Sequence, residues 1–154
     1  TQDKKCPLCN FDTCVIHPMG HIDLKFVECE RCGRFKISDR LFHYKDIKDK
    51  YIGEYGYLLS GLSREFFEIK EPPPTFLFED IEETLKHHLI PNLNSIEEKS
   101  KKILQRLREK TKYFGDEIIL DSSKDYSLAY AKNENEFRAL FSLLNEKKID
   151  ECRY

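Results

Sequence analysis

The chain has 154 residues, a mass of 18.4 kDa and a formal net charge of −2, with 40% hydrophobic and 35% charged residues. No apolar run approaches the roughly 18 residues that a membrane span needs, and the many Phe and Tyr residues argue against a disordered chain. The near-neutral charge gives no global electrostatic case for nucleic-acid binding. No signal peptide is recognisable, so we expect a cytoplasmic protein without membrane partners.

Cysteines carry the clearest chemical signal. Four of them form two Cys-x-x-Cys pairs that are separated by nineteen residues, which is the spacing of a four-cysteine zinc site. These residues are Cys6, Cys9, Cys29 and Cys32. The two-residue gap lets both sulfurs of a pair reach one tetrahedral ion at about 2.3 Å. Four thiolates leave no position for water or substrate, so we predict one structural Zn²⁺.

Other uses of the cysteines are the alternatives. Two disulfides would need an oxidising compartment, and nothing in the sequence exports the chain. A redox Cys-x-x-Cys usually occurs once, before a helix in a βαβ unit. Cys14, His17 and His21 lie between the pairs and are alternative ligands, although Cys14 also fits a buried strand position. Cys152 has no visible partner in the sequence.

Residues 1–37 are predicted to form a small β zinc ribbon. The residue after a cysteine pair often needs a positive φ, which Gly33 adopts freely and Asn10 tolerates. A unit of this size cannot bury enough surface alone, so the metal would supply folding energy. Its strands are expected at residues 11–17, 21–28 and 35–37.

Residues 38–74 are predicted to form a helical connector. Ser38 is a candidate N-cap for a short helix to about residue 49. A second helix is expected at 54–69, where one stripe contains Leu58, Leu62, Phe66 and Ile69. The run Pro72-Pro73-Pro74 forms a spacer and is the best candidate for a domain boundary.

Residues 75–154 are predicted to form a helical, winged-helix-like unit, which makes the fold class α+β. Capping boxes at Ser95/Glu98 and Asn133/Glu136 mark two helix starts. Helices are expected at about 79–90 (ending before Pro91), 95–112, 125–132 and 134–147, with strands at 117–120 and 149–154. This order matches a winged helix, but only one wing strand is available.

The helix around residues 99–112 is expected to have a basic outer face. Lys101, Lys102, Arg106 and Arg108 on that face are the candidates for nucleic-acid binding, and an ordinary solvated surface is the alternative. Its inner face is expected to consist of Ile96, Ile103, Leu107 and Phe114. The helix at 134–147 is a poor candidate for a recognition helix in the DNA major groove, since its carboxylates would repel phosphate.

No catalytic motif is recognisable, so we expect a protein that is not an enzyme. A Gly-rich phosphate loop, a nucleophile elbow and a His-Glu-x-x-His helix are all missing from the sequence. The most motif-like polar pair is Arg64-Glu65, at the end of the segment Leu-Ser-Gly-Leu-Ser-Arg-Glu. It is a candidate ligand or partner contact, and a weak surface ion pair is the alternative.

Four motifs resemble the N-terminal region of bacterial multidomain proteins. They are Cys-Pro-Leu-Cys, Cys-Glu-Arg-Cys-Gly-Arg-Phe-Lys-Ile-Ser, Leu-Ser-Gly-Leu-Ser-Arg-Glu and, at 126–131, Tyr-Ser-Leu-Ala-Tyr-Ala. Those proteins often end in a nucleoside 2-deoxyribosyltransferase-like or TIR-like domain, and are suspected in stress response and antiphage defence. The resemblance implies that this chain is the regulatory or recognition part of such a protein. The closed metal site, the missing catalytic motif, the near-neutral charge and the incomplete wing favour a non-catalytic module that acts through protein contacts or self-association. The alternative is a nucleic-acid-binding regulator that uses the basic helix 99–112 and the winged-helix-like unit.

Overall fold

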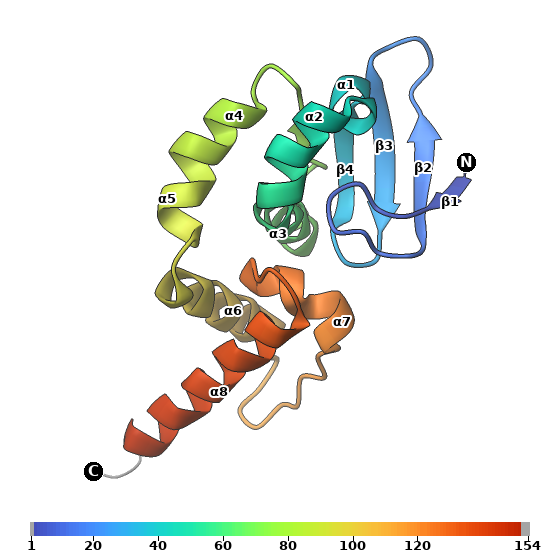
Figure 1. The fold of residues 1–154 in the computed structure, drawn as a ribbon. Helices are drawn as coiled ribbons and strands as arrows, with labels where there is room; N and C mark the ends of the chain where they lie inside the picture. Colours follow the sequence, from blue (N-terminus) through green and yellow to red (C-terminus); the bar gives the residue numbers. More distant parts are fainter. Residues whose placement is uncertain (1, 152–154) are drawn as a thin grey trace.

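The computed structural model describes the backbone of residues 2–151 and the side chains of residues 4–41 and 43–145. The fold is α+β, as predicted: a mixed sheet is followed by helices that pack against one of its faces and then extend away from it (Figure 1). Within the described residues, no helix is both long enough and apolar enough to cross a membrane.

The sheet has five strands in chain order. They are β1 (Gln2–Lys4), β2 (Cys14–Pro18), β3 (Leu24–Cys29), β4 (Gly33–Ser38) and β5 (Thr75–Phe76). Neighbours from β1 to β4 are antiparallel, whereas β5 runs parallel to β4. The three strands expected in residues 11–37 are present with shifted bounds. The sequence did not indicate β1 or β5, which gain their backbone partners from the longer strands.

Strand β5 brings the chain back to the first sheet directly after the proline run. The Lys36 amide donates a hydrogen bond to the Pro74 carbonyl at 2.9 Å, and Ile37 pairs with Phe76. The face of the sheet that packs against the helices contains Cys14, Ile16, Val27, Cys29, Phe35 and Ile37. The residues on either side of the spacer therefore share one hydrophobic core.

The predicted helix at 38–49 is interrupted. Helix α1 (Asp39–His43) ends at Tyr44, whose ψ of 108° is extended, and α2 (Lys45–Ile47) continues through a π-helical turn η1 (Lys48–Gly53) into α3. Helix α3 (Glu54–Glu68) confirms the helix expected at 54–69. It contacts β4 on one side and later helical segments on the other.

The next helix was expected to end before Pro91, but it continues past this residue. Helix α4 (Ile81–Thr84) continues through the π turn η2 (Leu85–Leu89) into α5 (Ile90–Leu93). A proline removes one backbone donor, and the widened turn lies where that donor is missing. The core-facing residues Ile81, Leu85 and Leu89 are buried, as their spacing of four predicts.

The C-terminal helices form a second core. They are α6 (Ile96–Lys110), α7 (Ser122–Asp125), the 3₁₀ turn η3 (Tyr126–Ala129) and α8 (Glu134–Glu151). Both predicted caps are confirmed, because Ser95 Oγ accepts from the Glu98 amide at 3.2 Å and Asn133 Oδ1 from the Glu136 amide at 2.9 Å. Ile103, Leu128, Phe137 and Leu140 are buried together.

The strands predicted at 117–120 and 149–154 are wrong within the described residues, which end at residue 151. Residues 117–120 are irregular, and Ile119 is 93% exposed, because no strand lies beside them to complete a ladder. Residues 149–151 belong to α8, since neither Gly nor Pro interrupts the helix after residue 134. The winged-helix-like unit is therefore not confirmed.

Candidate metal centre

The four predicted cysteine ligands converge at one end of the sheet. Their sulfur atoms all lie within 4.8 Å of one another. Cys6 Sγ is 3.8 Å from Cys32 Sγ, and Cys9 Sγ is 3.6 Å from Cys29 Sγ. In a tetrahedron with metal–sulfur bonds of about 2.3 Å, neighbouring sulfurs are about 3.8 Å apart. The cluster could therefore hold one metal ion.

Local backbone geometry brings each pair of cysteines together. In the first cysteine turn (residues 6–9), the Asn10 amide donates to the Cys6 carbonyl at 2.9 Å. In the second cysteine turn (residues 29–32), Cys29 pairs with Gly33 across the hairpin. Asn10 has a φ of 61° and Gly33 a φ of 81°, so the positive φ expected after each pair is confirmed.

The protein environment favours a bound cation over disulfides. Cys6, Cys29 and Cys32 are buried and Cys9 is partly buried. The sulfur separations are far above the roughly 2.04 Å of a disulfide bond, so the disulfide interpretation is wrong. Burial raises the pKa of the Cys6 and Cys32 thiols, whereas hydrogen bonding with Cys32 lowers the pKa of Cys29. A divalent cation would stabilise all four as thiolates.

The alternative ligands lie outside this group of four. Cys14 is buried on β2 and pairs in register with Cys29. His17 Nε2 is 2.9 Å from Glu28 Oε2 on the other face of the sheet, and His21 is exposed in the turn between β2 and β3. Cys152 lies outside the described residues.

The second cysteine turn docks on the C-terminal part of the chain through Arg31. Its Nε donates to the Ser123 carbonyl at 2.7 Å, and its Nη1 donates to the Cys9 carbonyl at 3.0 Å. The guanidinium lies over the rings of Phe11 and Tyr126. Arg31 therefore ties the two cysteine turns to each other and to α7.

The Arg64 side chain, predicted as a ligand or partner contact, lies inside the molecule. The residue is 8% exposed, and the hydrogen-bond acceptors of its guanidinium are the Arg31 carbonyl, the Lys124 carbonyl, Asp125 and Glu68. Two of these distances are short, at 2.8 Å to Glu68 and 2.7 Å to Asp125. Arg64 thus joins α3 to the second cysteine turn and to α7, a role that the sequence did not indicate.

Glu65 also binds within the chain. It accepts hydrogen bonds from Lys102 Nζ at 2.8 Å and from the Tyr130 hydroxyl, and Arg106 Nη2 is 4.0 Å away. Burial alone would raise the pKa of Glu65, but the hydrogen bonds and the nearby cations outweigh it and lower the pKa below its ordinary value. Burial beside Glu65 raises the pKa of Tyr130, so this tyrosine remains a donor.

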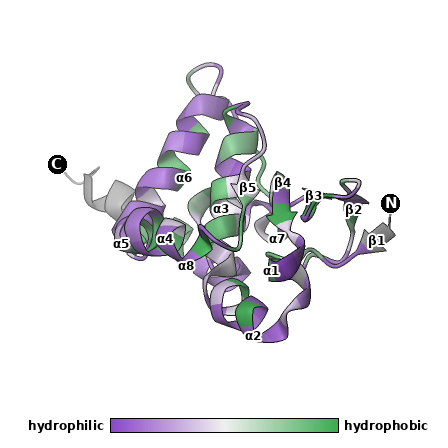
Figure 2. Ribbon diagram, turned by 90° about the horizontal axis from the view of Figure 1, so that it is seen from above, coloured by the Kyte–Doolittle hydropathy of each residue, from purple (hydrophilic) through white to green (hydrophobic). Residues whose placement is uncertain are grey.

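The four basic candidates on α6 do not form one exposed face. Lys101 and Arg108 are exposed, but Lys102 points to Glu65 and Arg106 is 3% exposed. The expectation of a continuous basic surface is therefore wrong, because α3 supplies carboxylates to the side of α6 that packs against it. The expected inner face is also only partly confirmed, since Ile103 is buried but Ile96 and Phe114 are exposed. The polar character of α6 beside the more hydrophobic α3 is visible in Figure 2.

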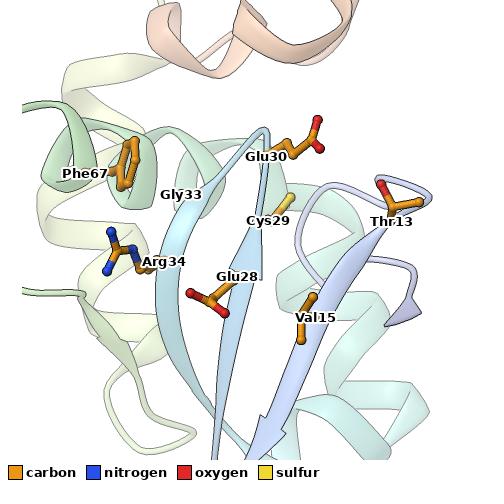
Figure 3. A pocket seen from close by; sticks show the side chains of 8 residues that line it. All are labelled: Thr13, Val15, Glu28, Cys29, Glu30, Gly33, Arg34 and Phe67. Atoms are coloured by element: carbon orange, nitrogen blue, oxygen red, sulfur yellow. The ribbon is translucent and has the colours of Figure 1, made fainter. Parts of the chain in front are cut away.

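A hollow of about 530 Å³ opens on the outer face of the sheet near the second cysteine turn (Figure 3). Glu28 and Arg34 project into it from β3 and β4, and Phe67 borders it from α3. A second hollow of about 540 Å³ lies between α3, η2, α5 and α6 and includes Glu65 and His88. Arg64 is not part of either lining.

Comparisons with family models, with curated proteins and with solved structures found no match to this chain. The site defines the chain as an α+β protein whose four-cysteine cluster could hold one metal ion. Four thiolates around one ion would leave no open coordination position, which is typical of structural metal sites.

Proposed function

We propose that this chain is a non-catalytic zinc-binding recognition or regulatory module that one structural Zn²⁺ stabilises. The observation that carries the proposal is the set of sulfur separations, 3.6 and 3.8 Å, which matches tetrahedral thiolate coordination. Zinc is the metal that four thiolates in a closed tetrahedral site most commonly bind. Metal binding would add folding energy at the end of the sheet where the two cysteine turns meet.

Elemental analysis of the purified chain tests this proposal. We expect one zinc per chain in the wild type, and loss of that zinc in a Cys29→Ser variant. Cys14→Ser is the matched control, because Cys14 is also a buried cysteine in a neighbouring strand but lies outside the group of four. A wild-type chain without metal, or equal zinc content in both variants, would contradict the proposal.

The proposed mode of action is contact with other protein surfaces. The loop between α6 and α7 supports it, because Tyr113, Phe114 and Ile119 are 66%, 105% and 93% exposed. Exposed apolar side chains that cluster in one loop often mark interaction sites. If this loop mediates self-association, the wild type will exceed 18.4 kDa in solution, and a Phe114→Ser/Ile119→Ser variant will return to the monomer mass. Static light scattering measures both, and a monomeric wild type would count against self-association.

The resemblance to bacterial multidomain proteins also supports a regulatory role. In such proteins a recognition region precedes a catalytic domain, and the motifs of this chain resemble that recognition region. Nucleic-acid binding receives less support from the structure, since Lys102 and Arg106 bind Glu65 and leave only Lys101 and Arg108 exposed among the four candidates.

A further inference from the structure

A serine hydroxyl from α3 reaches the cysteine cluster. Ser60 Oγ is 2.9 Å from Cys32 Sγ, and both residues are buried, at 3% and 0% exposure. We infer that Ser60 is a positioning residue of the metal centre, whose hydroxyl donates a hydrogen bond to the metal-bound Cys32 thiolate. This inference rests on the proposed metal site and identifies a residue outside the two Cys-x-x-Cys pairs that stabilises it.

The direction of this hydrogen bond follows from the chemistry of a bound thiolate. A cysteine sulfur that ligates a metal carries no proton, so it can only accept. The Ser60 hydroxyl is then the donor. A serine inside a helix can also donate to the carbonyl four residues earlier, here that of Gly56. The charged sulfur is the stronger acceptor, because hydrogen bonds to ionised groups are stronger than those between neutral groups.

The charge of the centre explains why such a donor matters. Four thiolates around one divalent ion carry a net charge of −2, and Cys6, Cys29 and Cys32 have little contact with solvent. Charge that is removed from water must be compensated by hydrogen bonds or by opposite charge. Arg31 bonds to the backbone of the first cysteine turn, whereas the Ser60 hydroxyl lies at a ligand sulfur itself.

Helix α3 offers a matched control for this role. Ser63 lies one turn further along α3, is also buried, and donates to the Arg34 carbonyl at 3.2 Å. Ser60→Ala and Ser63→Ala each remove one buried hydroxyl from the same helix. Only Ser60→Ala removes a hydrogen bond to a ligand sulfur. Loss of an outer-shell partner commonly lowers metal affinity by about 10–100-fold.

The experiment uses the full chain loaded with one Co²⁺ in place of zinc, since cobalt reports its sulfur ligands through charge-transfer absorption. We expect Ser60→Ala to shift this band to longer wavelength, because a sulfur without its hydrogen bond holds its electrons less tightly. We also expect it to lose metal to excess EDTA about 10-fold faster than the wild type. Ser63→Ala should keep the wild-type band and rate.

The two measurements separate a positioning role from general destabilisation. If Ser60→Ala loses metal faster but keeps the wild-type band, the serine stabilises the fold only and the inference is wrong. The same conclusion follows if both variants behave identically. A wild-type chain that takes up no metal would overturn the proposed function itself, an outcome that differs from either result.

Discussion

Asn10 closes the first cysteine turn in a left-handed backbone conformation, with a φ of 61°. At the equivalent position after the second turn, Gly33 has a φ of 81°. For most residues this conformation costs about 1 kcal/mol of free energy, whereas for Gly and Asn it costs less. The two cysteine turns therefore use different residues to meet one backbone requirement.

Substitution of Asn10 tests that requirement. Asn10→Ala should lower the free energy of unfolding by about 1 kcal/mol, because alanine tolerates positive φ poorly. Asn10→Gly should leave it within about 0.5 kcal/mol of the wild type, since glycine adopts this φ without a steric cost. Urea unfolding of the metal-loaded variants measures both values. Equal losses in the two variants would show that the Asn10 side chain, rather than its φ, stabilises the turn.

Glu65 links stability to pH. Its pKa is lowered in the folded state, so the unfolded chain binds a proton more readily than the folded chain. The stabilisation is fully present above the ordinary glutamate pKa of about 4.3, and it is lost as pH falls through the lower folded value. The carboxylate of Glu65 should thus contribute to acid unfolding.

Glu65→Gln is expected to remove part of that acid dependence. It should lower the free energy of unfolding by about 2 kcal/mol at pH 7, because a charged hydrogen-bond acceptor is lost, and by less below pH 4. Denaturant titrations from pH 7 to pH 3 measure the difference at each pH. Glu71→Gln, at an exposed position, is the control and should follow the wild type. A constant Glu65→Gln deficit would refute the linkage.

Among the elements, α3 has the most unusual buried surface. Its expected apolar stripe is only partly correct, because Leu58 is buried but Ile69 is 43% exposed. Buried instead are Leu59, Ser60, Gly61, Ser63 and Arg64, and the polar side chains among them bond to residues distant in sequence. Hydrophobic periodicity could predict the existence of α3, but it could not predict a buried polar face whose partners lie up to 61 residues away.

The cysteine cluster was predictable for the opposite reason. Its residue types and spacing indicate metal binding directly. The turn between β3 and β4 requires a positive φ, and Gly33 provides it. The short strand β5 could not be predicted, since two residues carry no periodicity and gain their partners from β4. The same dependence on neighbours explains why residues 117–120 are irregular despite a strand-like sequence.

Close packing between α3 and Tyr130, the residue directly after η3, gives a prediction about a glycine. A Cβ atom at Gly61 would lie 2.3 Å from the Tyr130 ring, whereas a Cβ at Gly53 would be no closer than 3.9 Å to its neighbours. Gly61→Ala should therefore lower the free energy of unfolding by about 1–3 kcal/mol through overpacking. Gly53→Ala, also in helical backbone, should raise it by about 0.5 kcal/mol.

Thermal or urea unfolding of the two variants provides the measurement. If Gly61→Ala is as stable as Gly53→Ala, Tyr130 can move away from α3 at no cost. The close approach would then be unimportant for the fold.

At the scale of the whole molecule, the cysteine centre is connected to regions far along the chain. The Arg31 carbonyl, inside the second cysteine turn, accepts hydrogen bonds from Arg64 at 3.0 Å and from Ser127 at 2.6 Å. The Arg31 side chain donates to the Ser123 carbonyl. Residues 122–131 are therefore bonded to a turn whose ends, Cys29 and Cys32, belong to the cluster that could hold a metal ion.

Metal removal should accordingly loosen residues 122–131 as well as the cysteine turns. Without the ion, residues 29–32 lose the constraint at both ends, and the bonds that Arg31 makes to α7 and η3 weaken with them. Hydrogen–deuterium exchange after chelation should show faster exchange in 122–131, while residues 81–93 of α4, η2 and α5, whose buried side chains pack on the main core, should change little. The Cys29→Ser variant should reproduce this pattern without a chelator. If exchange in 122–131 stays at the metal-loaded rate in both cases, the second cysteine turn keeps its shape without metal and the centre does not control the C-terminal helices.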